Sequence, residues 1–361
     1  MGTVDRIREI ETELKGTKYN KRTQKAVGIL KAKLAQMREK QRSGGGGHTT
    51  GYAVSKSGDA TVILVGFPSV GKSTLLNILT GSKSEVAAYA FTTLTVIPGE
   101  LKYKGAKIQI LDVPGIVEGA AIGRGRGKEV LQMIRNADLV ILLLDVFHPE
   151  HLSVLREEVY ATDVRLNQTA PDVSISKRPR GGLDIGTTVR LTNIDKETIE
   201  AICREMRISN AQIVIRENIN SDQLIDAIEK NKKYVPGIVV MNKIDLALSK
   251  QLDDVMKQTS ADIAVSGVTG EFIDELKELI FQRLRLIRIF TKEAGKKADM
   301  NEPLILRSGS TIKDICEKLH RDFVKKFKFV KVTGPSAKFA GQKFSLNHVV
   351  KDGDVVEMHL R

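Results

Sequence analysis

Apolar runs separated by amphipathic segments organise the middle of this chain. Residues 61–65, 137–146 and 237–246 are nearly continuous in apolar residues. Such runs are typical of strands that are buried on both faces of a parallel sheet. Because these strands alternate with helical segments, the pattern predicts an α/β fold with a doubly wound sheet, which we assign to residues 44–163 and 237–295.

In the N-terminal segment the apolar residues follow a different spacing. Within 3–15 and again within 20–42, apolar residues recur at spacings of three and four, as they do on one face of an amphipathic helix. The connection is short, so residues 1–43 predict an antiparallel helical hairpin, in which Gly16 ends the first helix and Asn20 caps the second. Its lysine- and arginine-rich face is expected to point outward.

The interval between the runs at 137–146 and 237–246 is much longer than a single helical crossover requires. It holds a turn-rich stretch at 169–186, then an expected short strand TTVRLT, a helix DKETIEAICREM and a strand AQIVI. These segments predict a small α/β subdomain inserted at 164–236.

The tail changes character again from residue 296. Strand-like segments PLILRS and FKFVKVTG flank a helix-like segment, TIKDICEKLHRDF, with Ser310 or Thr311 as its N-cap. Asp352 and Gly353 predict a turn into the last strand. Residues 296–361 are therefore expected to form a small domain of strands and one helix, of ubiquitin-like size.

Residues 66–73 read GFPSVGKS and directly follow the first apolar run. The pattern G-x-x-x-x-G-K-S between a strand and a helix is the phosphate-binding loop, in which backbone N–H groups and the helix N-terminus surround phosphate oxygens. Lys72 is expected to contact the β- and γ-phosphates of a nucleoside triphosphate, and Ser73 to ligate Mg²⁺. The residues expected to bind nucleotide here are Gly66, Pro68, Ser69, Val70, Gly71, Lys72, Ser73 and Thr74.

Two further segments complete the candidate site and indicate which base the bound nucleotide carries. Asp112 opens DVPG after a strand and can hold Mg²⁺ through water, while the N–H of Gly115 can bond the γ-phosphate. NKID, which contains Asn242, Lys243 and Asp245, ends a buried run. A carboxylate at Asp245 matches the N1–H and exocyclic amine of guanine but faces a lone pair in adenine. The sequence therefore favours guanine nucleotides.

The neighbours of Asp245 have expected roles as well. Lys243 can lay its alkyl stem along the base, and Asn242 can tie this loop to the phosphate-binding loop. Ser266 and Gly267, in AVSGVTG, lie where a backbone N–H can reach guanine O6.

Charge is concentrated at the two ends of the chain. The formal net charge is +13, of which residues 1–42 carry +7 and residues 300–361 carry +5. Basic ends indicate a polyanionic partner, most simply RNA, and ordinary solvated helix faces are the alternative. The sequence has no apolar run that could cross a membrane and no signal-peptide pattern. A cytoplasmic protein with neither membrane nor DNA partners is expected.

The ordered motifs GFPSVGKS, FTTL, DVPG and NKID resemble the TRAFAC class of GTPases, and DVPGIVEGA resembles its Obg-related group. With the basic hairpin, the insertion and a tail that ends DVVEMHL, the whole chain resembles the developmentally regulated GTP-binding proteins of archaeal type. The resemblance implies a P-loop GTPase with Mg²⁺ as cofactor and GTP and GDP as ligands. It also implies that the tail is a TGS domain of the β-grasp fold and that the insertion is a ribosomal-protein-like subdomain.

The resemblance implies catalytic roles too. Thr92 or Thr93, of which we favour Thr93, supplies the switch-loop hydroxyl to Mg²⁺, so that Lys72, Thr93 and Gly115 are the expected catalytic residues. Ile116 follows DVPG at the position where Ras-like enzymes place a water-orienting glutamine, and intrinsic hydrolysis is therefore expected to be slow. Potassium or a partner is expected to stimulate it, although K⁺ stimulation usually accompanies asparagine at the position of Ser69.

Two functions remain open at this stage. The favoured one is a GTP-hydrolysing switch that associates with the ribosome or ribosomal RNA and acts in translation, with a regulatory protein as a further partner. The alternative is a guanine-nucleotide-binding scaffold with negligible hydrolysis that recruits a protein. Arg124 and Arg126 can stabilise transition-state charge, bind RNA phosphate or keep their loop soluble. His148 and His151 are interpreted as loop and helix-start residues rather than metal ligands.

Overall fold

The chain forms two compact units. One contains the N-terminal helices and residues 163–234, and the other contains the rest. Among the helices of the described part, none combines the length and apolar character that crossing a bilayer requires. The computed structural model describes residues 3–43, 58–81, 87–88, 95–112, 133–293 and 295–360.

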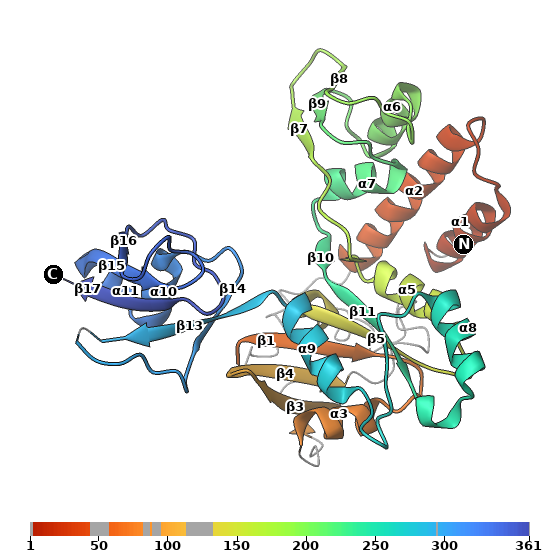
Figure 1. The fold of residues 1–361 in the computed structure, drawn as a ribbon. Coiled ribbons are helices and arrows are strands. Elements are labelled where there is room, and N and C mark those ends of the chain that lie inside the picture. Colours follow the sequence, from red (N-terminus) through yellow and green to blue (C-terminus); the bar gives the residue numbers. More distant parts are fainter. Residues whose placement is uncertain are drawn as a thin grey trace. The chain divides into compact units, whose positions relative to one another are not determined.

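A seven-stranded sheet is the centre of the larger unit, in the order β12-β11-β5-β1-β4-β3-β2 (Figure 1). The five strands from β12 to β4 are parallel, while β3 runs antiparallel to β4 and β2 antiparallel to β3. The strands are β1 (Ala60–Val65), β2 (Ala87–Ala88), β3 (Thr95–Tyr103), β4 (Ala106–Asp112), β5 (Leu139–Asp145), β11 (Gly237–Asn242) and β12 (Ile263–Ala264).

Burial on both faces explains the composition of the central strands. Every residue of β1, β5 and β11 is buried, as their continuous apolar runs predict. Helices α3 (Lys72–Thr80) and α9 (Ile273–Arg283) lie side by side over one face of the sheet (Figure 1) and contribute leucines and isoleucines to its core. Helices α5 (His151–Ala161) and α8 (Ser249–Thr259) also belong to this unit. The predicted α/β fold is confirmed.

Strand order places the site. The strand β4 lies on one side of β1, whereas β5 and β11 lie on the other side, so the strand order reverses at β1. Parallel strands bring their carboxyl ends to one edge, and ligands of open α/β sheets bind at such a switch point. The carboxyl ends of β1, β4, β5 and β11 therefore lie together at this edge.

The C-terminal domain is a five-stranded sheet, in the order β14-β13-β17-β15-β16, packed against α10 (Ile312–Leu319) and α11 (Arg321–Lys326). Thr311 caps α10, and Asp314 completes a capping box. The first strand of this sheet lies before the boundary expected at residue 296, because Ile287 and Ile289 alternate into the C-terminal core. The strands are β13 (Leu286–Lys292), β14 (Leu304–Arg307), β15 (Phe327–Thr333), β16 (Gln342–Phe344) and β17 (Val355–Leu360).

In the smaller unit the N-terminal helices pack on the inserted subdomain. Ala32 of α2 (Gln24–Ser43) belongs to the same core as Ile199 and Ile202, on α6 (Lys196–Glu205). The basic face is therefore not wholly outward, since Lys31 pairs with Asp222 at 2.6 Å. α1 (Thr3–Gly16) packs on α2, which begins later than predicted because Asn20 closes a turn by accepting the N–H groups of Arg22 and Thr23. The subdomain also contains α7 (Ser221–Glu229) and the paired strands β6 (Val164–Leu166) and β10 (Lys233–Val235).

Two strand predictions in the insertion are wrong. The strand expected at TTVRLT lies earlier, at β8 (Leu183–Thr187), and the stretch expected to be turns contains β7 (Val173–Lys177) as well. Both strands pair with β9 (Ala211–Ile215), β7 antiparallel and β8 parallel. Alternation of apolar residues in VSISK and LDIGT was the available signal, and the nearby proline and glycines concealed it.

Candidate nucleotide-binding site

The loop between β1 and α3 depends on two glycines. A Cβ on Gly66 would lie 2.7 Å from the carbonyl oxygen of Leu143. Gly71 has a φ of +93°, and a Cβ there would lie 2.4 Å from Nδ2 of Asn242. Both positions therefore exclude side chains, which lets the loop wrap closely at the end of the sheet.

Lys72 lies at the start of α3 and folds back over this loop. Its Nζ donates to the carbonyl oxygens of Gly66 at 3.0 Å and Phe67 at 2.9 Å. Partial burial lowers the pKa of Lys72, and the nearby Asp112 carboxylate opposes that shift. The ammonium group is thus held at the mouth of the loop, where a phosphate can replace lost hydration.

Ser73 and Asp112 bring two oxygen ligands together. The hydroxyl of Ser73 donates to Oδ2 of Asp112 at 3.1 Å. Asp112 is 5% exposed, and its Oδ1 is buried without a partner among the described residues. Burial raises the pKa of Asp112, while Lys72 and the Ser73 hydroxyl lower it. An unsatisfied carboxylate oxygen beside a hydroxyl fits a hard divalent cation such as Mg²⁺.

Asn242 connects the phosphate-binding loop with the loop after β12. It is 2% exposed, its Nδ2 donates to the carbonyl oxygen of Val70 at 2.9 Å, and its Oδ1 accepts the N–H of Gly267 at 3.0 Å. The link that the sequence predicts, from Asn242 to the phosphate-binding loop, is therefore present. Because the Nδ2 and the Oδ1 of this buried amide both form hydrogen bonds, the two loops are fixed relative to each other.

Asp245 is held by a neighbouring loop but stays exposed. Its Oδ1 accepts the hydroxyl of Ser266 at 2.6 Å. The backbone N–H groups expected to reach guanine O6 are otherwise engaged, because Ser266 donates to the carbonyl of Glu271 at 3.2 Å and Gly267 donates to Asn242. The contact with guanine O6 stays a prediction. Ser266 and Gly267 instead orient Asp245 and Asn242.

Asp145, at the end of β5, was missed as a site residue. Its Oδ2 pairs with Nζ of Lys243 at 3.2 Å, and its Oδ1 accepts the N–H groups of Phe147 and His148. Lys243 has a φ of +64°, so the side chain begins from a left-handed backbone that this ion pair helps to hold. A charged residue closing an apolar strand next to NKID was the available signal.

Several expected site residues are exposed or fall outside the described part. Pro68, Ser69, Ser73 and Thr74 are exposed around the loop, whereas Val70 is buried beneath it. The residues outside the described ranges are Thr92, Thr93, Gly115, Ile116, Arg124 and Arg126.

A histidine cluster lies beside the phosphate-binding loop. The ring of His151, the first residue of α5, stacks on Phe67 at a centroid distance of 3.8 Å and on His148 at 4.9 Å. His148, Glu150 and His151 each offer a ligand atom within 4.8 Å of the others, which their spacing in sequence did not predict. The helix-start position of His151 agrees with the sequence interpretation.

Together, the parallel sheet, the phosphate-binding loop with its Ser73–Asp112 contact, and the strand-end Asn-Lys-Ile-Asp sequence define a P-loop GTPase. Family models match in the same order: the 50S ribosome-binding GTPase over residues 61–177, the C-terminal region of the MMR_HSR1 domain over 180–286, and the TGS domain over 287–359. Developmentally-regulated GTP-binding protein 1 of Xenopus laevis is 42% identical over 99% of both chains, and this chain belongs to the developmentally regulated GTP-binding protein family.

Other relatives span the full chain. An uncharacterized GTP-binding protein of Methanocaldococcus jannaschii is 54% identical, covering 100% of this chain and 94% of the relative. The protein named Ribosome-interacting GTPase 1 in Saccharomyces cerevisiae is 42% identical, covering 98% of each. The resemblance inferred from the motifs is therefore confirmed, including the C-terminal TGS domain.

Proposed function

We propose that this GTPase is a slow molecular switch that acts on the ribosome or its RNA during translation. The contact between Ser73 and Asp112 is the main observation that supports the switch. The other carboxylate oxygen of Asp112 is buried and has no partner in the described part of the chain, and the carboxylate lies next to Lys72. Such a group favours a state with Mg²⁺ and phosphate bound. In this switch Thr93 and Gly115, which lie outside the described residues, would contact Mg²⁺ and the γ-phosphate before hydrolysis and lose those contacts after it.

The proposal gives each residue of the phosphate-binding loop and its neighbours a role. Lys72 binds the β- and γ-phosphates, and the backbone N–H groups of the loop cradle them. Ser73 and Asp112 would hold Mg²⁺, with Thr93 as a further ligand in the triphosphate state, and the N–H of Gly115 would contact the γ-phosphate. The remaining contacts of the phosphates come from Gly66, Pro68, Ser69, Val70, Gly71 and Thr74.

Asp245 selects guanine in this proposal. Its carboxylate accepts two hydrogen bonds from the base, and the Ser266 hydroxyl fixes the direction in which the carboxylate points. Lys243 lies along the base, and Asn242 keeps this loop in register with the phosphate-binding loop.

Slow intrinsic hydrolysis is proposed because Ile116 cannot orient water, so a monovalent cation such as K⁺ or a partner must help. Single-turnover GTP hydrolysis with and without K⁺ and ribosomes tests this. We expect measurable phosphate release that rises with at least one addition. Tight GTP binding with no release under any condition would instead support the alternative, a nucleotide-binding scaffold, which the missing glutamine favours.

Association with the ribosome is supported by the basic ends and by names of relatives. Residues 1–42 and 300–361 together hold nearly all of the net charge. The Saccharomyces cerevisiae relative is named a ribosome-interacting GTPase, and the matching family model describes 50S ribosome-binding GTPases. Deleting residues 1–42 is a poor test, because α2 contributes to the core of the inserted subdomain. Charge reversal at the exposed Lys18 and Arg22 is the better change.

A further inference from the structure

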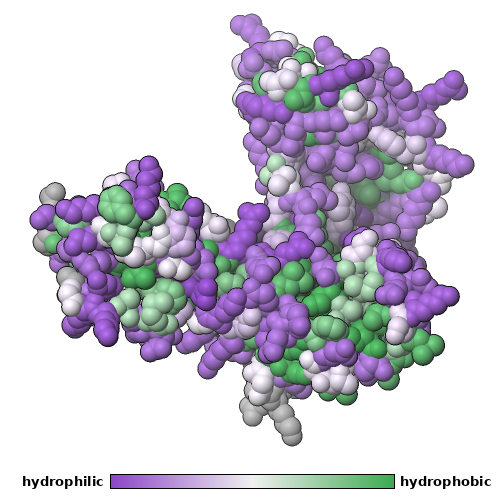
Figure 2. All heavy atoms as spheres, in the orientation of Figure 1, coloured by the Kyte–Doolittle hydropathy of each residue, from purple (hydrophilic) through white to green (hydrophobic). Residues whose placement is uncertain are grey.

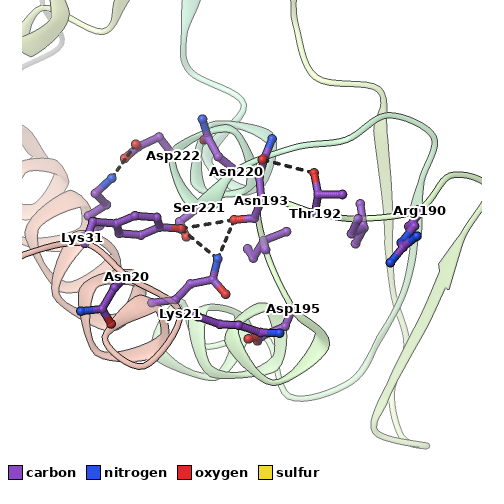
Figure 3. A pocket seen from close by; sticks show the side chains of 14 residues that line it. Asn20, Lys21, Lys31, Arg190, Thr192, Asn193, Asp195, Asn220, Ser221 and Asp222 are labelled. Carbon is purple, nitrogen blue, oxygen red and sulfur yellow. Dashed lines mark hydrogen bonds and ion pairs between the residues drawn. The ribbon is translucent and has the colours of Figure 1, made fainter.

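A pocket of about 720 Å³ opens within the smaller unit (Figure 3). Its walls are the turn between α1 and α2, the loop before α6 and the start of α7. This volume lies in the range of pockets that bind small ligands or single nucleotides. The pocket is distinct from the nucleotide site at the phosphate-binding loop, which belongs to the other unit.

Tyr19 gives the pocket an exposed aromatic surface held in one orientation. The residue is 55% exposed, yet its hydroxyl donates to the carbonyl of Asn193 at 3.2 Å and accepts from Nε2 of Gln24 at 2.9 Å. Gln24 is 7% exposed and also donates to Asn193 at 2.6 Å. An aromatic ring that is exposed but anchored suits stacking against a flat ligand, because little freedom is lost on binding.

The start of α7 supplies hydrogen-bond donors. Asn220 caps the helix by accepting the N–H of Gln223, while the N–H groups of Ser221 and Asp222 have no partner among the described residues. The Ser221 hydroxyl, in a residue 2% exposed, is also unpartnered there and belongs to a residue that lines the pocket. Unpaired donors at the positive end of a helix favour an anion such as phosphate.

The charges around the pocket favour an anion as well. Lys21 and Arg190 line it and have no acidic partner in the described part of the chain. Of the two carboxylates at the pocket, Asp222 is neutralised by its ion pair with Lys31, while Asp195 caps α6 by accepting the N–H of Thr198 at 2.7 Å and keeps its charge. The visible face of this unit is largely hydrophilic (Figure 2). Two cations therefore line the same pocket as the free donors and outnumber the one carboxylate without a cationic partner.

We propose that this pocket binds one unpaired nucleotide of an RNA chain, with its base stacked on Tyr19 and its phosphate at the start of α7. The inference rests on the RNA association proposed above and names a contact that would produce it. An anchored ring combined with cations and backbone donors is how proteins bind single-stranded nucleic acid. Paired bases inside a duplex cannot reach the ring.

Fluorescence anisotropy with a labelled single-stranded RNA oligonucleotide and the full-length protein tests the pocket. Tyr19→Ala should weaken binding roughly tenfold, the effect of losing one stacked base, whereas Tyr19→Phe keeps the ring, loses only the anchoring hydroxyl and should weaken binding clearly less. Replacing Lys21 and Arg190 with alanine should lower the slope of log affinity against log salt by about 0.7 for each RNA phosphate that the protein no longer neutralises. Lys233→Ala, an exposed cation of the same unit outside the pocket, is the matched control.

The outcomes distinguish RNA binding in the pocket from a structural role of Tyr19 and from diffuse attraction by surface charge. Equal weakening by Tyr19→Phe and Tyr19→Ala would show that Tyr19 only supports the fold, and equal weakening by Lys233→Ala would show diffuse attraction. Either result overturns the proposal, as does an RNA affinity unchanged by all variants or absent altogether. Adenosine monophosphate that binds as tightly as the oligonucleotide would make the ligand a free nucleotide and would also overturn it. GTP affinity, measured in parallel, should stay constant, so loss of RNA binding is distinguishable from failure of the GTPase switch.

Discussion

Asp112 shows how a single residue can lower stability while serving function. Its carboxylate is nearly fully buried, and one oxygen has no hydrogen-bond partner in the described structure. Leaving a buried polar atom unsatisfied costs about 1–3 kcal/mol in the nucleotide-free protein. In the proposed site a cation bound to Asp112 would remove that cost, so this oxygen would favour the complex with Mg²⁺ and nucleotide.

Asp112→Asn is therefore expected to stabilise the nucleotide-free protein and weaken the nucleotide complex. Because burial raises the pKa of Asp112 above the unfolded value of about 3.9, the carboxyl reduces stability as pH rises from that value through the folded pKa. The variant should gain roughly 1 kcal/mol in the free energy of unfolding at pH 7, and the gain should shrink toward pH 4. Its Mg²⁺-dependent GTP affinity should fall at least about tenfold. Urea unfolding across pH and titration with GTP measure both, and a variant less stable than the unchanged protein at pH 7 would contradict this account.

Asp245→Asn tests the base contact. The amide can donate to the second carbonyl of xanthine but cannot accept both hydrogens of guanine, so GTP affinity should fall roughly 100-fold while xanthosine triphosphate gains. Competition binding with the two triphosphates measures the ratio. Asp253→Asn makes the same change at an exposed position of α8 and should leave the ratio unaltered. Unchanged preference in Asp245→Asn would remove that residue from the site.

Much of the site could be predicted at this scale because motif spacing encodes it. Gly66, Lys72 and Ser73 are fixed by the chain between one strand and the next helix, and the tie made by Asn242 follows from NKID at a strand end. Asp145 was missed because its contact with Lys243 depends on the pairing of β5 with β11, far apart in sequence. The hydrogen bond from the Gly267 N–H to Asn242 likewise depends on the packing of the loop after β11 against the loop after β12.

At the scale of elements, Gly28 lets two helices approach closely. It lies within α2, and a Cβ there would lie 3.0 Å from Cγ2 of Thr198 and 3.1 Å from Cδ1 of Ile202, both on α6. Without a side chain at this position, the backbone of α2 contacts the apolar face of α6. The packing of the N-terminal hairpin on the inserted subdomain therefore depends on one small residue.

Gly28→Val should destabilise the smaller unit by about 1–3 kcal/mol through overpacking against α6. Gly16→Val is the matched control, because a Cβ at that position would meet no atom within 4 Å, and it should change the free energy of unfolding by less than about 0.5 kcal/mol. Urea unfolding measures both variants. Equal effects of the two substitutions would mean that α2 does not pack on α6 as described.

Elements were predictable where their pattern is strong and local. The buried strands β1, β5 and β11 and the helices α6 and α10 follow from apolar runs and helical spacing. The strands β7 and β8 are short, half exposed and separated by proline and glycine, so turn signals outweighed their alternation. The strand β13 follows α9 without a clear break, and its pairing with β14 and β17 assigns it to the TGS sheet.

At the scale of the whole molecule, the chain combines a GTPase and TGS unit with a second unit made from its N-terminus and its insertion. These two segments of the second unit are separated by the first half of the GTPase sheet in sequence. No local pattern predicts that they share a core, because the contact between α2 and α6 is between surfaces that each look like an ordinary amphipathic face. The consequence for function is that basic charge from the N-terminus is carried by the inserted subdomain.

The central claim is that nucleotide controls attachment to the ribosome, and chemical footprinting on purified ribosomes tests it most directly. The full-length protein is bound with a non-hydrolysable GTP analogue in one sample and with GDP in another, and protection of ribosomal RNA is compared. The proposed switch, in which the protein reads the γ-phosphate, predicts a discrete footprint with the analogue that is lost or strongly weakened with GDP. An identical footprint with both nucleotides, or none with either, would contradict it.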